Sequence, residues 1–151
     1  MSIKRLGDPT HISDAVIHDN VIYLAGQVAE DPVLPSVYEQ TRNVLKQIDE
    51  LLAEAGTNKS RILKTNIWLA DIATFGEMNR AWGEWVAKGN APARATVEAK
   101  LAQPKWLVEI MVTAALKDKA RPAAKPARKK AAKKAAKRGA KGKAKKKARR
   151  R

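Results

Sequence analysis

The segment APARATVEAKLAQPKWLVEIMVTAAL, residues 91–116, contains two stretches with the pattern of β-strands. In residues 93–101, charged or polar side chains alternate with the apolar set Ala95, Val97, Ala99 and Leu101. Residues 107–116 are apolar almost throughout. Alternation is typical of a strand with one buried face, and a continuous apolar run is typical of a strand buried on both faces. The segment therefore predicts two strands, the first with its apolar face toward the core.

Each of these strands carries an isolated charge. Arg94 falls on the polar side of the first strand, so its side chain is expected to point away from the apolar layer. Glu109 interrupts the second strand, where its neighbours favour burial. A lone charge in a strand is either part of a structural ion pair or part of a functional site, and these two residues alone leave both possibilities open.

The residues before this segment predict a hairpin and a first helix. Residues 15–18 and 21–25 have the character of strands, and the turn-forming pair Asp19-Asn20 joins them. Ser36 and Glu39 have the spacing of a capping box, and apolar residues then recur at helical spacing until Gly56.

A further strand and a second helix follow the first helix. Residues 62–70 alternate as a strand does and end at Asp71. Thr74 and Glu77 have the spacing of a second capping box. The helix that they introduce has an apolar stripe, predicted to face the core, which consists of Phe75, Met78, Ala81, Trp82, Trp85 and Val86. The resulting order of elements predicts an α+β or mixed α/β fold with helices packed on one sheet.

Charge divides the 151-residue chain into two predicted parts. Residues 1–118 contain 13 Lys+Arg and 15 Asp+Glu, a net charge of −2, whereas residues 119–151 contain 18 Lys+Arg and no acidic residue. The sequence thus predicts one domain over 1–118 followed by a disordered basic tail over 119–151. A domain of this size buries a modest fraction of its surface, so oligomerisation would add useful burial.

Several classes of site lack support in the sequence. The absence of cysteine excludes disulfides, thiolate zinc sites and cysteine nucleophiles. His11 and His18 show no metal-ligand spacing and are interpreted as surface residues, so no metal is expected. No stretch approaches the length of an apolar membrane span, and no apolar segment follows the first basic residues, which indicates a cytoplasmic protein without membrane contact.

Six short segments together resemble the RidA (YjgF) family in sequence and in order. They are Leu24-Ala-Gly-Gln27, Gln40-Thr-Arg42, Lys64-Thr-Asn-Ile-Trp-Leu-Ala-Asp71, the stretch from Phe75 to Asn79, Pro92-Ala-Arg94 and Val108-Glu-Ile110. The resemblance covers nearly all of residues 12–116. It implies an α+β, chorismate-mutase-like fold with a mixed sheet and two helices on one face. It also implies a cofactor-independent enamine/imine deaminase that forms homotrimers with active sites between subunits.

The resemblance assigns roles to individual residues. Arg94 matches the arginine that holds the carboxylate of a 2-imino acid, a task that suits a planar guanidinium with parallel N–H donors. Glu109 matches the glutamate that orients or deprotonates the attacking water, the reaction giving a 2-keto acid and ammonia. Further substrate-binding positions are Ala25, where the family commonly has serine, Gly26, Asn79, and Thr96, where many members have cysteine. Gly26 and Asn79 are also compatible with plain structural or surface roles.

The predicted tail suggests a separate function. Its Lys-, Ala- and Pro-rich composition is similar to the tails of linker-histone-like and bacterial nucleoid proteins. Such a segment binds DNA or RNA without sequence preference through counterion release, and it lacks aromatic residues that could stack on bases. The expected contacts are Lys129, Lys130, Lys133, Lys134, Lys137 and Arg138. The alternatives are a solvated appendage and, for the whole chain, a non-catalytic trimeric ligand sensor or nucleoid-associated nucleic-acid-binding protein.

Overall fold

The computed structural model describes residues 2–117 of the chain. The strands are β1 Ile3–Leu6, β2 Ala15–His18, β3 Val21–Leu24, β4 Gln27–Val28, β5 Ile62–Leu69, β6 Ala93–Glu98 and β7 Val108–Ala115. The helices are α1 Val37–Glu54 and α2 Phe75–Trp85, with short 3-10 turns at Lys59–Arg61 and Ile72–Thr74. The predicted tail and its six proposed contact residues lie outside the described residues.

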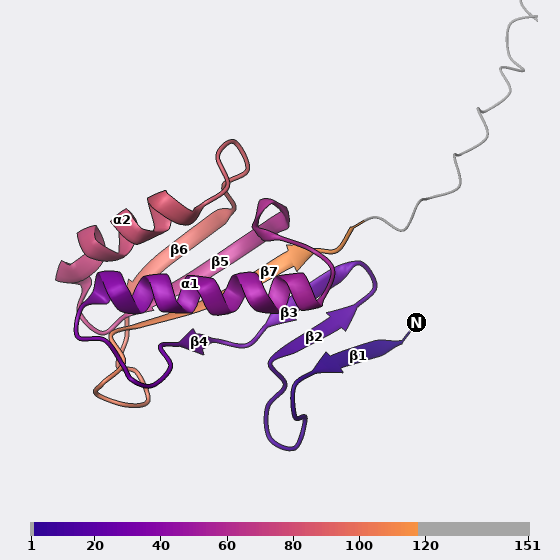
Figure 1. Cartoon of the computed structure of the whole chain (residues 1–151), viewed down its shortest axis with the longest axis horizontal. Helices are drawn as coiled ribbons and strands as arrows, with labels where there is room; N and C mark the ends of the chain where they lie inside the picture. The colour runs from indigo at the N-terminus through magenta and orange to yellow at the C-terminus, as the bar shows by residue number, and fades with distance from the viewer. Residues whose placement is uncertain (1, 118–151) are drawn as a thin grey trace, which may run out of the picture. The chain divides into compact units, whose positions relative to one another are not determined.

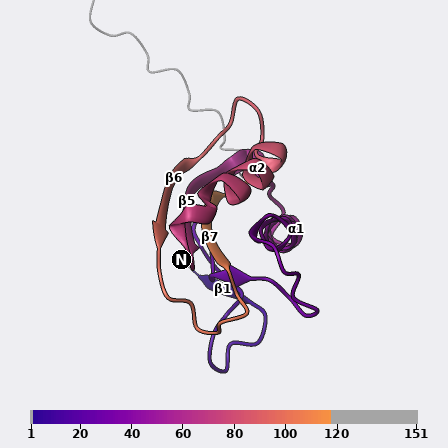
Figure 2. The same cartoon turned by 90° about the vertical axis from the view of Figure 1, so that its left-hand side faces the viewer.

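The strands form one mixed sheet in the order β1-β2-β3-β7-β5-β6, and β4 pairs with β7 beside β3. Strands β5 and β6 are parallel and are connected through α2, while the other pairs are antiparallel. Both helices lie on the same side of the sheet, as the two views show (Figures 1 and 2). The predicted α+β fold with two helices on one face is therefore confirmed.

The hydrophobic core fills the layer between the helices and the sheet. Ile48 and Leu52 from α1, Met78 from α2 and Ile110 from β7 are fully buried there. Buried Gln40 of α1 also fixes the entry into β7, because its side-chain amide accepts a hydrogen bond from Leu107 N at 2.9 Å and donates to Lys105 O at 3.0 Å. The start of the strand that carries Glu109 is thus tied to α1 by satisfied buried hydrogen bonds.

Both predicted helix starts are correct in position, but only the first has the predicted capping hydrogen bond. Ser36 caps α1 by accepting a hydrogen bond from Glu39 N at 3.2 Å, as its spacing predicts. Thr74 makes no side-chain cap for α2, and its hydroxyl instead donates to Asp71 O at 2.6 Å. The chain enters α2 through the 3-10 turn at Ile72–Thr74, where Asp71 accepts from Ala73 N. Asp71 thus caps the 3-10 turn, while Thr74 occupies the N-cap position of α2 without a side-chain capping hydrogen bond.

The face assignment of β6 is also wrong. The register places Arg94 beside Thr65 and Thr96 beside Ile67, and both of these β5 residues are buried beneath the helices. Arg94 and Thr96 therefore point toward the helical layer. Val97 lies on the opposite, open face and is 50% exposed. The alternation was recognised correctly, but the open face of this sheet itself carries apolar side chains.

The open face of the sheet is apolar over four strands. Tyr23 on β3, Val97 on β6 and Met111 on β7 are exposed there, and Trp68 on β5 is half-buried between Val97 and Glu109 in the register. Strand β7 is buried on its helix side alone, so the prediction that it is buried on both faces is wrong. Apolar surface gathered in this way is typical of a face that contacts another protein.

Candidate active site

Arg94 is a residue of the edge strand β6, and its side chain contacts helix α2. Its Nη2 atom donates a hydrogen bond to Asn79 Oδ1 at 2.9 Å. Its Cζ atom is 5.1 Å from the centre of the Trp82 ring and 5.8 Å from that of Phe75. The structure thus brings Arg94, Asn79 and Thr96 together on one face, and aromatic rings help to hold the guanidinium in place.

Several polar atoms around Arg94 are buried without a hydrogen-bond partner. They are Arg94 Nη1 itself, the hydroxyl of Thr96 on the same strand, and the hydroxyl of Thr65, which is next to Arg94 in the register. A buried donor without a partner costs free energy, typically about 1–3 kcal/mol and more for a charged group. These atoms make the helix side of β6 polar around Arg94, and a guanidinium of this kind is suited to bind a carboxylate.

Arg94 stays positively charged although it is partly buried. Burial lowers the pKa of the guanidinium from its ordinary value. Arginine nevertheless stays protonated in proteins, because its ordinary pKa lies so far above neutrality. Arg94 therefore presents a permanent positive charge that water screens less than it would at a fully exposed site.

Glu109 lies at a different place, on the open face of β7. Its neighbours in the sheet register are Val28 on β4 and Trp68 on β5. Its carboxylate lies against Gly26, so closely that a Cβ atom added at Gly26 would overlap Glu109 Oε1 and would be 2.9 Å from Cδ. Gly26 is thus needed for the position of Glu109, a role that its sequence context left undecided.

Ala25 and Gly26 form the link between β3 and β4. Ala25 N donates to Asp14 O at 2.9 Å, and Ala25 O accepts from Gln27 Nε2 at 3.2 Å. These bonds fix the backbone that passes under Glu109. Ala25, Gly26 and Glu109 therefore make up a second group of the predicted site residues.

The two groups of site residues do not meet within one chain. Arg94, Thr96 and Asn79 lie on the helix side of the sheet, whereas Glu109 projects from the open side. No ion pair joins Arg94 to Glu109 within residues 2–117, so a structural ion pair between them is excluded. A single copy of the chain therefore holds two separate groups of predicted site residues, the Arg94 half-site on the helix side and the Glu109 half-site on the open side.

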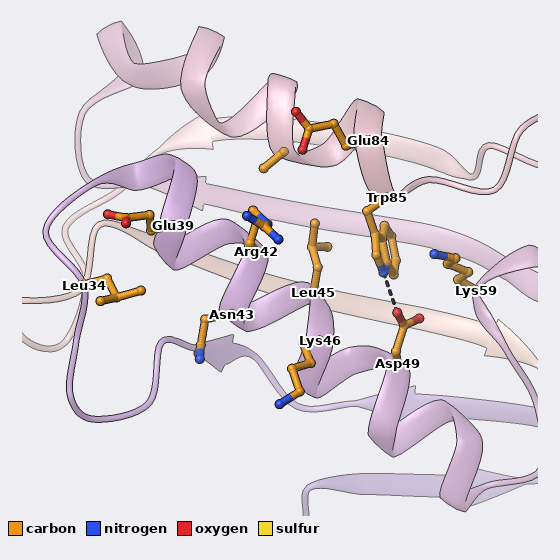
Figure 3. A pocket seen from close by; sticks show the side chains of 11 residues that line it. Leu34, Glu39, Arg42, Asn43, Leu45, Lys46, Asp49, Lys59, Glu84 and Trp85 are labelled. Carbon is orange, nitrogen blue, oxygen red and sulfur yellow. Dashed lines mark hydrogen bonds between the residues drawn. The ribbon is translucent and has the colours of Figure 1, made fainter.

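The groove between α1 and α2 is separate from both half-sites (Figure 3). It has a volume of about 630 Å³, and Trp85 at one end donates a hydrogen bond to Asp49 Oδ2 at 2.8 Å. Its charges are mixed, because α1 contributes Glu39 and Arg42, α2 contributes Glu84 and the first 3-10 turn contributes Lys59. It contains none of the predicted site residues and is not part of the candidate active site.

Residues 2–117 contain neither a cluster of metal ligands nor a membrane-spanning helix. In this part of the chain, no group of three or more His, Cys, Asp or Glu side chains could hold a metal ion. None of its helices has the length and apolar character needed to cross a membrane.

Comparison with known proteins assigns the chain to a family. The model of the family described as Endoribonuclease L-PSP matches residues 3–116. A RutC family protein of Haemophilus influenzae is 49% identical over 114 residues, which cover 76% of this chain and 98% of that protein. The rat 2-iminobutanoate/2-iminopropanoate deaminase is 38% identical over 107 residues, covering 68% of this chain and 77% of that enzyme.

Solved structures give the same result. A YjgF family member from Neisseria meningitidis superimposes with a TM-score of 0.75 and 45% sequence identity, covering 78% of this chain and 98% of that one. The described sheet and its two helices thus have a close structural counterpart.

Proposed function

Because this chain belongs to the Endoribonuclease L-PSP family, which includes the RidA and YjgF proteins, we propose that it hydrolyses reactive 2-imino acids to 2-keto acids and ammonia. The observation that carries the proposal is Arg94, whose buried Nη1 has no partner although Asn79 and two aromatic rings hold the guanidinium in place. Related enzymes from rat and human are named as deaminases of this kind, at 38% and 34% identity.

The chemistry follows from the two half-sites. Arg94 binds the substrate carboxylate and so orients the neighbouring C=N carbon. Glu109 accepts a proton from water, whose oxygen bonds to that carbon, while the imine nitrogen takes up a proton from solvent and becomes an amine. The protonated Glu109 then gives its proton to this nitrogen, the C–N bond breaks and ammonia leaves. The hydroxyl group loses its proton to solvent as the C=O bond forms. Thr96 and Asn79 complete the carboxylate side of the site, and Ala25 and Gly26 form its backbone wall beside Glu109.

A homotrimer supplies both halves of each site. Three copies related by a threefold axis make the same head-to-tail contact three times, so the Arg94 half of one copy can face the Glu109 half of the next. The open sheet face offers the apolar surface for such contacts, through Tyr23, Val97 and Met111. The partner is therefore a second copy of this chain, and the substrate is a small imino acid.

The direct test measures the release of 2-keto acid from imines that an amino-acid oxidase generates in situ. We expect the chain to accelerate hydrolysis above the rate in buffer, without added metal or cofactor. If no imine is hydrolysed faster over a range of amino-acid precursors, the enzyme assignment fails. The alternative is then a non-catalytic trimer that senses a carboxylate ligand at Arg94.

The substitution Gly26→Ala should displace the Glu109 carboxylate while leaving the fold unchanged. The added methyl overlaps the Glu109 carboxylate, which must move. Since a misplacement of about 1 Å can cost about 10²-fold in rate, we expect kcat/KM for imine hydrolysis to fall by about that factor, with thermal unfolding little changed. The matched control is Gly83→Ala, where a Cβ meets nothing within 4 Å and helix propensity improves. Equal activities of the two variants would contradict the role of Gly26.

The basic tail is proposed to bind nucleic acid, which would associate the enzyme with the nucleoid. Residues 119–151 contain 18 cationic and no acidic residues, and three copies per trimer would add avidity. We expect deletion of residues 119–151 to abolish binding to duplex DNA and to RNA at moderate salt, measured by fluorescence anisotropy, while imine hydrolysis is unchanged. The intact chain should lose affinity steeply as salt rises. A tail-less protein that still binds DNA would overturn this assignment.

A further inference from the structure

Phe75 differs from the rest of the apolar stripe of α2. Met78 is fully buried and Trp82 nearly so, whereas Phe75, the first residue of the helix, is 39% exposed. An exposed apolar side chain alone is common on protein surfaces and carries no meaning. Phe75, however, lies beside Arg94, with its ring centre 5.8 Å from the guanidinium carbon. An exposed aromatic ring therefore borders the guanidinium that is proposed to bind the substrate.

The side chain of a 2-imino acid held by Arg94 can reach this ring. The carbon that begins the side chain is two bonds from the carboxylate carbon. When arginine holds the carboxylate at about 2.8 Å, that carbon lies roughly 6 Å from the guanidinium carbon, a distance similar to that of the Phe75 ring. A ring at the distance of Phe75 is then within van der Waals reach of a side chain that extends beyond a methyl group. The ring of Trp82, 5.1 Å from the guanidinium carbon, is buried and so less accessible to a substrate than that of Phe75.

The carboxylates at this end of α2 are already engaged. Glu98 Oε2 accepts a hydrogen bond from Ile72 N at 2.9 Å, and Glu77 Oε2 accepts from Tyr38 N at 3.4 Å. An apolar side chain gains by removing the ring of Phe75 from water.

We propose that Phe75 is a specificity-determining residue that receives the substrate side chain and favours 2-imino acids with apolar side chains of the size of leucine or phenylalanine. This inference rests on the proposed deaminase function and names its preferred substrate class. Contact between the substrate side chain and the ring of Phe75 adds apolar surface burial, and a difference of this size typically changes kcat/KM about tenfold.

The experiment compares imines made in situ from alanine, leucine and phenylalanine. For Phe75→Ala we expect kcat/KM to fall about tenfold for the leucine- and phenylalanine-derived imines relative to the alanine-derived imine. Phe75→Leu should keep most of the preference because it retains an apolar wall. Ile72→Ala is the matched control, since Ile72 is similarly exposed and lies three residues away. Circular dichroism and gel filtration should show the same fold and assembly for every variant.

The outcomes separate this inference from the proposed function. If the unmodified chain accelerates all imines and Phe75→Ala leaves their relative rates unchanged, the role of Phe75 is overturned while the deaminase assignment stands. A uniform loss for all three imines, or a changed assembly, would likewise overturn it, because it would indicate a structural role. If the unmodified chain accelerates none of them, the function and this inference both fail.

Discussion

Replacement of Arg94 by alanine is expected to reduce kcat/KM for imine hydrolysis by about 10³-fold, because it removes the group that binds the substrate carboxylate in a partly dehydrated site. The guanidinium is held by Asn79 and two aromatic rings, so the unmodified site is largely organised before the substrate arrives. The measurement is steady-state release of 2-keto acid. We expect most of the loss to appear in KM when the carboxylate is bound equally in the ground and transition states.

Arg80→Ala is the matched control for Arg94→Ala. Arg80 is also on α2, but its guanidinium packs on the ring of Tyr38 at 4.0 Å and not on the rings that flank Arg94. It should retain full activity. Arg94→Lys should recover part of the loss, since lysine keeps the charge without the planar pair of donors. An Arg94→Ala protein that is folded and fully active would refute the assignment of Arg94.

The elements of the domain could be predicted largely because their patterns are long. The 18 residues of α1 and the eight of β5 span several periods of their repeats. Strand β1, with the sequence Ile-Lys-Arg-Leu, offers too few residues and too much charge to show alternation. Strand β4 has two residues and exists because β7 pairs with it, so its signal lies in its partner and not in its own sequence.

The faces of the strands could not be predicted in the same way. Alternation in 93–98 shows that two faces differ, but which face meets the helices depends on pairing with β5, where buried Thr65 and Ile67 set the register. The apolar side chains of β6 lie on the open side of the sheet, where other strands also place apolar residues. A sequence pattern alone cannot distinguish a core face from a face that contacts another subunit.

The charged residues of the candidate site could be predicted from the sequence, but their separation onto two faces of the sheet could not. Arg94 and Glu109 stood out as lone charges in strands, and the structure places them on opposite faces. Thr65 and Phe75 were missed as neighbours of Arg94, since a buried threonine and an apolar helix residue resemble ordinary core positions in sequence. Their signals are the unpaired hydroxyl of Thr65 and the exposure of Phe75, both of which require coordinates.

Replacement of Glu109 by glutamine is expected to lower kcat for imine hydrolysis by about 10²- to 10⁴-fold, the usual contribution of a general base. Glutamine has nearly the same shape and still fits against Gly26, but it cannot accept the proton of the attacking water. KM should change little, because Arg94 and its surroundings on the helix face are untouched. Single-turnover measurements would locate the loss in the chemical step. A variant with normal kcat would show that Glu109 has no part in catalysis.

Mixing the two inactive variants tests whether the site is shared between copies. If Arg94 of one subunit works with Glu109 of the next, a mixed trimer of Arg94→Ala and Glu109→Gln subunits contains some clefts with both native residues. Random head-to-tail assembly from equal amounts makes about a quarter of the clefts intact, so about a quarter of the native activity should return after unfolding and refolding together. Variants refolded separately and then combined serve as the control. Lack of recovery in verified mixed trimers would mean that subunits do not share the site, and the open face would then need another partner.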